Sequence, residues 1–98
     1  MEPECGAAKI DAMRYMVIET FRDAPAIYRR FAEKGRMMPE GLSYIESWIS
    51  EDVRVCYQLM EAGDPELLRE WTRNWDDLMD FEIVPVISSA EARERSLR

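Results

Sequence analysis

Four runs of residues have the short apolar period that is typical of β-strands. Residues 14–21 are β-branched and aromatic, with Glu19 as the main polar interruption, so we expect a strand that is buried on both faces. Residues 42–50 and 53–60 alternate apolar with polar side chains, and the two residues between them predict a hairpin. The last run, 81–87, contains a proline, which favours an edge strand or a bulge because proline has no N–H to donate to a neighbour.

Two segments between these strands repeat apolar residues at helical spacing. Asp23 can cap the first helix, and Gly35 supplies a left-handed residue that ends it. Asp64 and Pro65 can begin the second helix. We expect core positions at Ile27, Tyr28 and Phe31 in the first helix, and at Leu68, Trp71, Trp75 and Leu78 in the second.

The two ends of the chain differ from its centre. Residues 1–12 are small, polar and aperiodic, so we expect a disordered extension there. Ser88 and Glu91 have the spacing of a capping box at the start of the charged segment 89–98, which predicts a short, frayed helix or tail. The folded domain is therefore expected to span residues 13–88.

The order of elements is strand, helix, strand, strand, helix, strand. This order predicts an α+β fold of the ferredoxin-like βαββαβ type, with an antiparallel four-stranded sheet whose first and third strands are central and whose helices lie on one face. The strands are apolar on both faces, and two helices can cover only one of them. A monomer would leave a large apolar face in water, so we expect a homodimer in which a second copy of the sheet covers it.

Charge and composition exclude several classes of function. The chain has 98 residues, with 13 Lys and Arg against 20 Asp and Glu, and its net charge of −7 repels the phosphates of nucleic acids and of anionic membranes. Histidine is absent, which argues against haem and zinc, and we expect no cofactor and no metal. No run of apolar residues is long enough for a signal peptide or a membrane span, so we expect a cytoplasmic protein.

Two cysteines, Cys5 and Cys56, are too few to hold a zinc ion by themselves. A disulfide between them is open but not implied, because one lies in the polar N-terminal segment and the other in a predicted strand.

Five segments of the chain carry a resemblance to known proteins: MRYMVIETF at 13–21, GRMMPEGL at 35–42, the Ser47–Trp48 pair, CYQLME at 56–61 and FEIVPVISS at 81–89. They resemble a group of short bacterial proteins known as a domain of unknown function. More distantly, the chain is similar to the dimeric α/β-barrel superfamily, in which two ferredoxin-like units pack sheet to sheet around a shared cavity. That similarity implies the fold and a homodimer. The superfamily includes cofactor-free monooxygenases, isomerases and haem-degrading enzymes, but its haem chemistry generally uses a histidine, which this chain lacks.

Glu19 is the candidate catalytic residue, because it is a carboxylate within an otherwise apolar strand that is predicted to be central. If it points into a cavity between two sheets, loss of water raises its pKa and makes it a usable proton acceptor near neutral pH. The alternatives are a wet position at the mouth of the sheet or an ion pair with Arg14 or Arg36. We favour the ion pair, since an unpaired carboxylate on a central strand costs stability.

Five other residues are candidates for ligand binding. Cys56 and Gln58 share a face of the third strand, and Gln58 adds a hydrogen-bond donor and acceptor. Tyr44 and Trp48 share a face of the second strand, where they could stack on a flat ligand or lie in a subunit interface. Arg36 could close over an anionic substrate, although a plain salt bridge or a favourable charge at the end of the preceding helix is the simpler interpretation.

These observations leave two hypotheses for function. The first is a non-catalytic homodimer that holds a small apolar or aromatic molecule between its sheets, or simply forms a core there. The alternative is a cofactor-free enzyme of the monooxygenase or isomerase type, with Glu19 as the base and with Gln58 and Tyr44 orienting the substrate. A cavity on the order of hundreds of Å³ that contains Glu19 favours the enzyme, and a dry, filled interface favours the first hypothesis.

Overall fold

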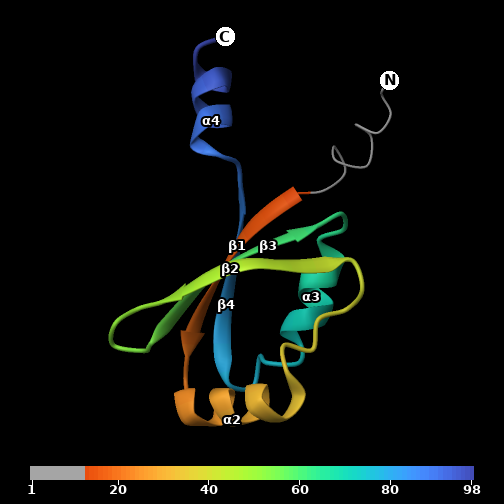
Figure 1. Ribbon diagram of the computed structural model, residues 1–98, viewed down its shortest axis with the longest axis vertical. Helices are drawn as coiled ribbons and strands as arrows, with labels where there is room; N and C mark the ends of the chain where they lie inside the picture. Colours follow the sequence, from red (N-terminus) through yellow and green to blue (C-terminus); the bar gives the residue numbers. More distant parts are fainter. Residues whose placement is uncertain (1–12) are drawn as a thin grey trace.

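The computed structural model describes residues 13–98, which form one antiparallel sheet with helices against one of its faces (Figure 1). The predicted disordered extension, residues 1–12, lies outside the described residues. So does Cys5, the other cysteine of the disulfide that the sequence left open. The elements in chain order are β1 (Met13–Phe21), α2 (Ala24–Lys34), β2 (Leu42–Ile49), β3 (Val55–Ala62), α3 (Glu66–Thr72), β4 (Met79–Val86) and α4 (Ser89–Ser96).

The strand order is β2-β3-β1-β4, and each neighbouring pair is antiparallel. Strands β1 and β3 are therefore central, and the proline-containing β4 is an edge strand. This arrangement confirms the predicted ferredoxin-like α+β fold.

The sheet has two faces of different character. The inner face packs against α2 and α3, and its side chains include Tyr15, Val17, Glu19, Cys56, Gln58 and Met60. Ile27 of α2 and Leu68 and Trp71 of α3 join it in one hydrophobic core. The outer face is opposite, and its side chains include Met16, Ile18, Trp48, Tyr57, Leu59 and Val84.

The outer face has no cover within residues 13–98. Trp48 and Tyr57, which pair across β2 and β3, are 49% and 42% exposed. Met16 and Ile18 on the central strand β1 are only half-buried. The expectation that β1 is buried on both faces is therefore wrong for a single chain, because both packed helices lie on the inner face.

Both ends of α2 and the start of α4 follow the local sequence as predicted. The side chain of Asp23 accepts a hydrogen bond from the backbone N–H of Ala26, and Gly35 ends α2 with a φ of 68°. Ser88 caps α4 by accepting from the N–H of Glu91. Helix α4 has no buried residue and extends away from the sheet (Figure 1). Among the helices of the described part, none has the length and apolar character needed to cross a bilayer.

Helix α3 is shorter than the apolar spacing predicted, since it ends at Thr72. The chain continues through turns in which backbone N–H groups bond three residues back, as from Trp75 to Thr72 and from Leu78 to Trp75. These tighter turns keep Trp75 buried, although it lies outside the helix. The apolar spacing therefore predicted the burial of Trp75 correctly and the C-terminal end of α3 incorrectly.

The hairpin between β2 and β3 also differs from the prediction. Its connection spans residues 50–54 rather than two residues, because Val53 adopts a left-handed φ of 59° and the side chain of Ser50 accepts from the N–H groups of Arg54 and Val55. These side-chain bonds support a wider turn than the two-residue type.

A register shift between Tyr44 and Glu46 interrupts β2. An extra residue at a bulge moves the following side chains to the opposite face of the sheet. Tyr44 therefore pairs with Met60 of the inner face, whereas Trp48 pairs with Tyr57 of the outer face. The expectation that Tyr44 and Trp48 share a face is wrong for this reason.

Candidate functional site

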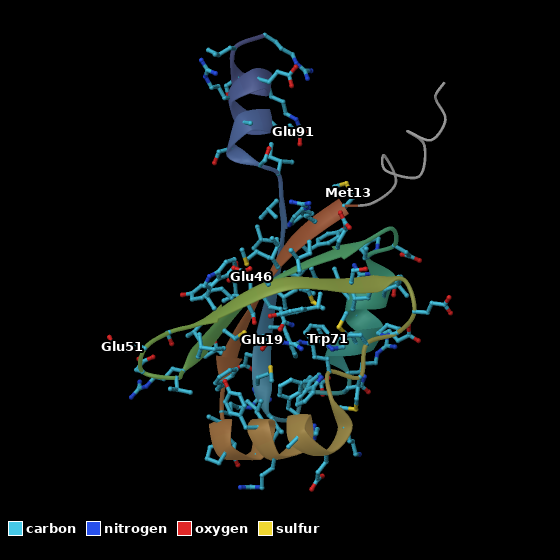
Figure 2. All side chains as sticks on the ribbon, in the orientation of Figure 1. Met13, Glu19, Glu46, Glu51, Trp71 and Glu91 are labelled. Carbon is cyan, nitrogen blue, oxygen red and sulfur yellow. The ribbon has the colours of Figure 1, made fainter. Side chains whose placement is uncertain are left out.

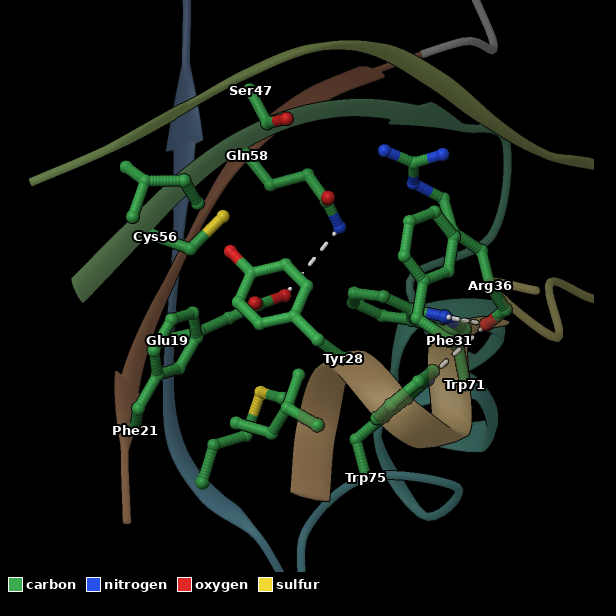
Figure 3. A pocket seen from close by; sticks show the side chains of 13 residues that line it. Glu19, Phe21, Tyr28, Phe31, Arg36, Ser47, Cys56, Gln58, Trp71 and Trp75 are labelled. Carbon is green, nitrogen blue, oxygen red and sulfur yellow. Dashed lines mark hydrogen bonds between the residues drawn. The ribbon is translucent and has the colours of Figure 1, made fainter. Parts of the chain in front are cut away.

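A pocket of about 240 Å³ lies between the inner face of the sheet and α2 (Figure 3). Figure 2 shows Glu19 and Trp71 together in this part of the molecule. The pocket lies within one chain, on the helix side, and so differs from the cavity between two sheets that the sequence led us to expect. Its polar lining is Glu19, Arg36, Ser47, Cys56 and Gln58, and its aromatic lining is Phe21, Tyr28, Phe31, Trp71 and Trp75.

Glu19 is buried at the centre of this lining, with 6% of its surface exposed. Its position on β1 is opposite Cys56 of β3 and Phe81 of β4. Burial raises the pKa of Glu19 to about 7, and this effect outweighs a hydrogen bond with Cys56 and the charge of Arg36, which both lower it. The carboxyl group can therefore gain or lose a proton near neutral pH.

The ion pair that we favoured for Glu19 is not formed among residues 13–98. Arg14, one expected partner, pairs instead with Glu61, with 3.6 Å between Nε and Oε2. Arg36 acts on Glu19 through its charge but makes no ion pair with it. A second hydrogen bond from β3 also involves a neutral side chain, because Gln58 donates from Nε2 to Oε2 of Glu19 over 3.4 Å.

Cys56 and Gln58 share the inner face, as the alternation predicted, and both are buried. The pKa of the Cys56 thiol is raised to about 12, mainly by burial. The nearby charge of Glu19 also raises this pKa. The thiol is free and stays protonated, so it is suited to packing and to hydrogen bonding with Glu19 rather than to nucleophilic attack.

Tyr28 forms the wall of the pocket opposite the sheet. It lines the same pocket as Glu19, and its hydroxyl points toward Cys56 (Figure 3). Its ring also makes an edge contact with Phe21, with 6.3 Å between the centroids. Burial raises the pKa of Tyr28, and Cys56 and Glu19 raise it further.

Arg36 is held at the pocket by both its backbone and its side chain. Its carbonyl oxygen accepts from the indole Nε1 of Trp71 at 2.8 Å and of Trp75 at 3.1 Å. Its guanidinium carbon lies 3.7 Å from the ring centroid of Tyr44 and 5.0 Å from that of Phe31. Two buried tryptophans therefore fix the loop, and two aromatic rings fix the cation.

A family model for a domain of unknown function, DUF3303, matches residues 13–97. The chain belongs to the DUF3303 family. No curated protein and no solved structure matches the chain. The family assignment confirms the predicted domain of unknown function, and the matched region takes in the residues of α4.

In this DUF3303 chain, the structure brings together four of the six candidate residues. Glu19, Arg36, Cys56 and Gln58 line the pocket. Tyr44 lies beside it, stacked on Arg36, and its hydroxyl shares a 2.8 Å hydrogen bond with Ser47. Trp48 lies on the outer face and takes no part.

Sequence reasoning missed several residues that line the DUF3303 pocket. Tyr28, Phe31, Trp71 and Trp75 have the helical spacing of core residues, and that spacing carries no sign of a pocket. Ser47 was missed because the bulge in β2, which the alternation does not reveal, turns it inward opposite Gln58. Residues 13–98 bring no group of three His, Cys, Asp or Glu side chains into an arrangement for a metal ion.

Proposed function

We propose that this DUF3303 protein binds a small, flat, largely apolar molecule in the pocket between its sheet and α2. The observation that carries this proposal is the buried carboxyl group of Glu19, which faces an aromatic-lined space and forms no ion pair with any described residue. A buried carboxyl group without a cation costs stability, so a folding role alone is a poor explanation for it. Binding sites combine such an apolar wall with few polar groups.

The same observation favours a second candidate, a cofactor-free enzyme with Glu19 as general base. In that reaction the carboxylate removes a proton from an acidic C–H or O–H of the substrate, and the electron pair of the broken bond stays on the substrate as an enolate or phenolate. Gln58 donates to Glu19 and so holds its carboxylate in place. The Tyr28 hydroxyl, which points toward Cys56 in the same pocket, is the donor available to the developing anion.

A homodimer belongs to the proposal as well, with the outer faces of two sheets packed together. The support is the row of apolar side chains on that face, including exposed Trp48 and Tyr57. In such a dimer the two pockets stay separate, because each lies on the helix side of its own sheet. We also expect a cytoplasmic location, for which the free Cys56 thiol is support.

A fragment screen tests the binding proposal. Small aromatic compounds are mixed with the protein, and binding is followed by ligand-observed NMR and by tryptophan fluorescence, to which Trp71 and Trp75 of the pocket contribute. Ser47→Phe places a large ring in the pocket and should abolish binding, whereas Trp48→Phe, one residue away on the outer face, should leave it intact. Compounds that bind both variants equally, or a screen without binders, would contradict the proposal.

A deuterium-exchange experiment separates the enzyme from a simple binder. Bound compounds with an acidic C–H are incubated in D₂O, and loss of the C–H signal is followed by proton NMR. If Glu19 is the base, Glu19→Gln abolishes exchange while the compound still binds. Exchange that continues in Glu19→Gln would exclude Glu19 as the base, and binding without exchange would leave the protein a binder only.

A further inference from the structure

Arg36 differs from the ion-paired arginines of the described residues in what surrounds its charge. Six arginines between residues 13 and 98 form ion pairs with carboxylates. Arg36 forms no ion pair within this part of the chain, and its guanidinium donates no hydrogen bond to a described residue, although it lines the pocket (Figure 3). Its N–H groups are therefore available to a ligand.

The surroundings of Arg36 also orient those N–H groups. The rings of Tyr44 and Phe31 lie near the guanidinium carbon, at 3.7 and 5.0 Å from ring centroid to carbon. Stacking occupies the face of a guanidinium and leaves the N–H groups in its plane free for a planar anion. A carboxylate can accept two parallel hydrogen bonds from that edge.

The loop that carries Arg36 is fixed before any ligand arrives. Its carbonyl oxygen accepts from the indoles of Trp71 and Trp75, which are 2% and 4% exposed. A side chain that starts from an anchored backbone and stacks on two rings loses little conformational freedom when it binds. This preorganisation is typical of a recognition group rather than of a solvated surface charge.

We infer that the ligand of this pocket is a small planar monoanion, with a carboxylate or similar group paired to Arg36 and a flat apolar body against the aromatic lining. This inference rests on the proposed binding function and adds the charge and orientation of the ligand. The net charge of −7 repels anions at long range, so the overall charge of the protein does not favour such a ligand. A preference for an anion must therefore come from the pocket itself.

The test compares two probes with the same flat body, trans-cinnamate and trans-cinnamamide, of which only the first is charged. Each is titrated at pH 6 into wild type, Arg36→Gln and Arg29→Gln and followed by calorimetry. Arg29 is an exposed residue of α2 outside the pocket lining, so its replacement matches the change in net charge without touching the pocket. Circular dichroism confirms that each variant is folded.

We expect wild type to bind cinnamate at least ten times more tightly than cinnamamide. Arg36→Gln should abolish that preference and leave cinnamamide binding within about twofold of wild type, because stacking does not depend on the charge of the probe. Arg29→Gln should keep the preference, and Arg36→Lys should keep part of it, since lysine has the charge without the planar fork.

Each other result has a separate meaning. Equal affinity of wild type for both probes would overturn the inference and leave the pocket proposal standing. Absence of binding by either probe would overturn both. A preference that survives in Arg36→Gln, or one that Arg29→Gln removes equally, would assign the effect to general charge and overturn the inference.

A measurement on wild type alone covers the case in which Arg36→Gln fails to fold. Intermolecular NOEs should place the vinyl protons of cinnamate, which lie next to its carboxylate, near Tyr44 and Phe31. They should place its phenyl ring near Trp71 and Tyr28. The reverse orientation would overturn the inference.

Discussion

Gln58 donates a hydrogen bond from Nε2 to the Oε2 of Glu19 over 3.4 Å, although the two residues are 39 positions apart. The antiparallel pairing of β1 and β3 makes them diagonal neighbours, because Glu19 is opposite Cys56 and Val17 is opposite Gln58. A neutral amide does not neutralise a carboxylate as an arginine would. Glu19 therefore keeps a raised pKa in the folded protein, which makes it sensitive to pH.

Glu19→Gln should stabilise the protein at high pH. The pKa of Glu19 rises from 4.5 to about 7 on folding, so the native state binds a proton more tightly than the unfolded state. Its contribution to stability therefore falls as pH rises from about 4.5 through 7, and the glutamine variant should be more stable than wild type by about 1–3 kcal/mol at pH 8.

Urea titrations of both proteins at pH 5 and pH 8, at one protein concentration, measure this difference. Glu33→Gln removes an exposed carboxylate on α2 and serves as the control, with no gain expected. A Glu19→Gln protein that loses stability at pH 8 would point to a favourable partner for the carboxylate and contradict the prediction.

Cys56 should react slowly with alkylating reagents. Its pKa is raised from 9.0 to about 12, which at pH 8 makes the thiolate fraction roughly a thousand-fold smaller than for an ordinary cysteine. In a Cys5→Ser background, iodoacetamide labelling followed by mass spectrometry should show this. Glu19→Gln should speed the reaction, because the charge of Glu19 contributes to the raised pKa. Labelling of Cys56 at the rate of a free thiol would refute the prediction.

The outer face should mediate a homodimer with twice the mass of one chain in sedimentation experiments. Tyr57→Glu places a charge on that face and should shift the protein to monomers, while the monomer fold persists because Tyr57 is already 42% exposed in it. Ala32→Glu adds the same charge on the exposed side of α2 and should leave the dimer intact. A wild type that sediments as a monomer at micromolar concentration would exclude the dimer.

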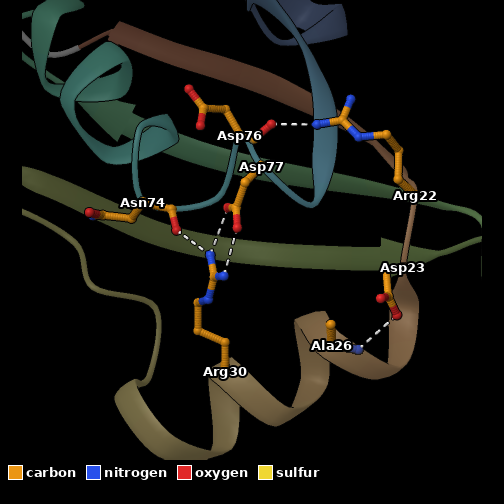
Figure 4. Close-up of polar contacts among 7 residues, drawn as sticks. All are labelled: Arg22, Asp23, Ala26, Arg30, Asn74, Asp76 and Asp77. Atoms are coloured by element: carbon orange, nitrogen blue, oxygen red, sulfur yellow. Dashed lines mark hydrogen bonds and ion pairs between the residues drawn. The ribbon is translucent and has the colours of Figure 1, made fainter.

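Asp77→Asn should weaken the contact between α2 and the turns that follow α3. Arg30 of α2 donates to both carboxylate oxygens of Asp77, at 2.9 and 2.8 Å, and also to the carbonyl of Asn74 (Figure 4). The hydrogen bonds from Arg30 lower the pKa of Asp77 from 3.8 to about 2. The stabilising contribution is therefore present above pH 3.8 and is lost as pH falls through about 2.

Thermal melts at pH 7 should show a lower melting temperature for Asp77→Asn than for wild type, and the difference should disappear near pH 2. Asp76→Asn removes the same charge one residue earlier, where only the backbone carbonyl accepts from Arg22, and should have a smaller effect. Equal melting temperatures of the two variants at pH 7 would show that the Arg30–Asp77 pair does not stabilise the fold.

The sequence by itself determined the order of elements, the ferredoxin-like fold and the helix caps. The caps depend on contacts between residues that are near in the chain: Asp23 caps the helix that follows it, and Gly35 takes the left-handed conformation that ends it. The proline of β4 likewise fixed an edge position, because it lacks a donor. The sequence also identified Glu19 and Gln58 as chemically unusual within apolar strands.

Only the tertiary structure decided which of these residues meet. The bulge in β2 sends Tyr44 inward and Trp48 outward, and alternation alone gives no sign of it. The register of β1 against β3 brings Gln58 rather than an arginine to Glu19. Two tryptophans that looked like core residues bind the carbonyl of Arg36. Periodicity reports on local geometry, whereas strand register and helix docking depend on contacts between distant segments, and these contacts made the pocket.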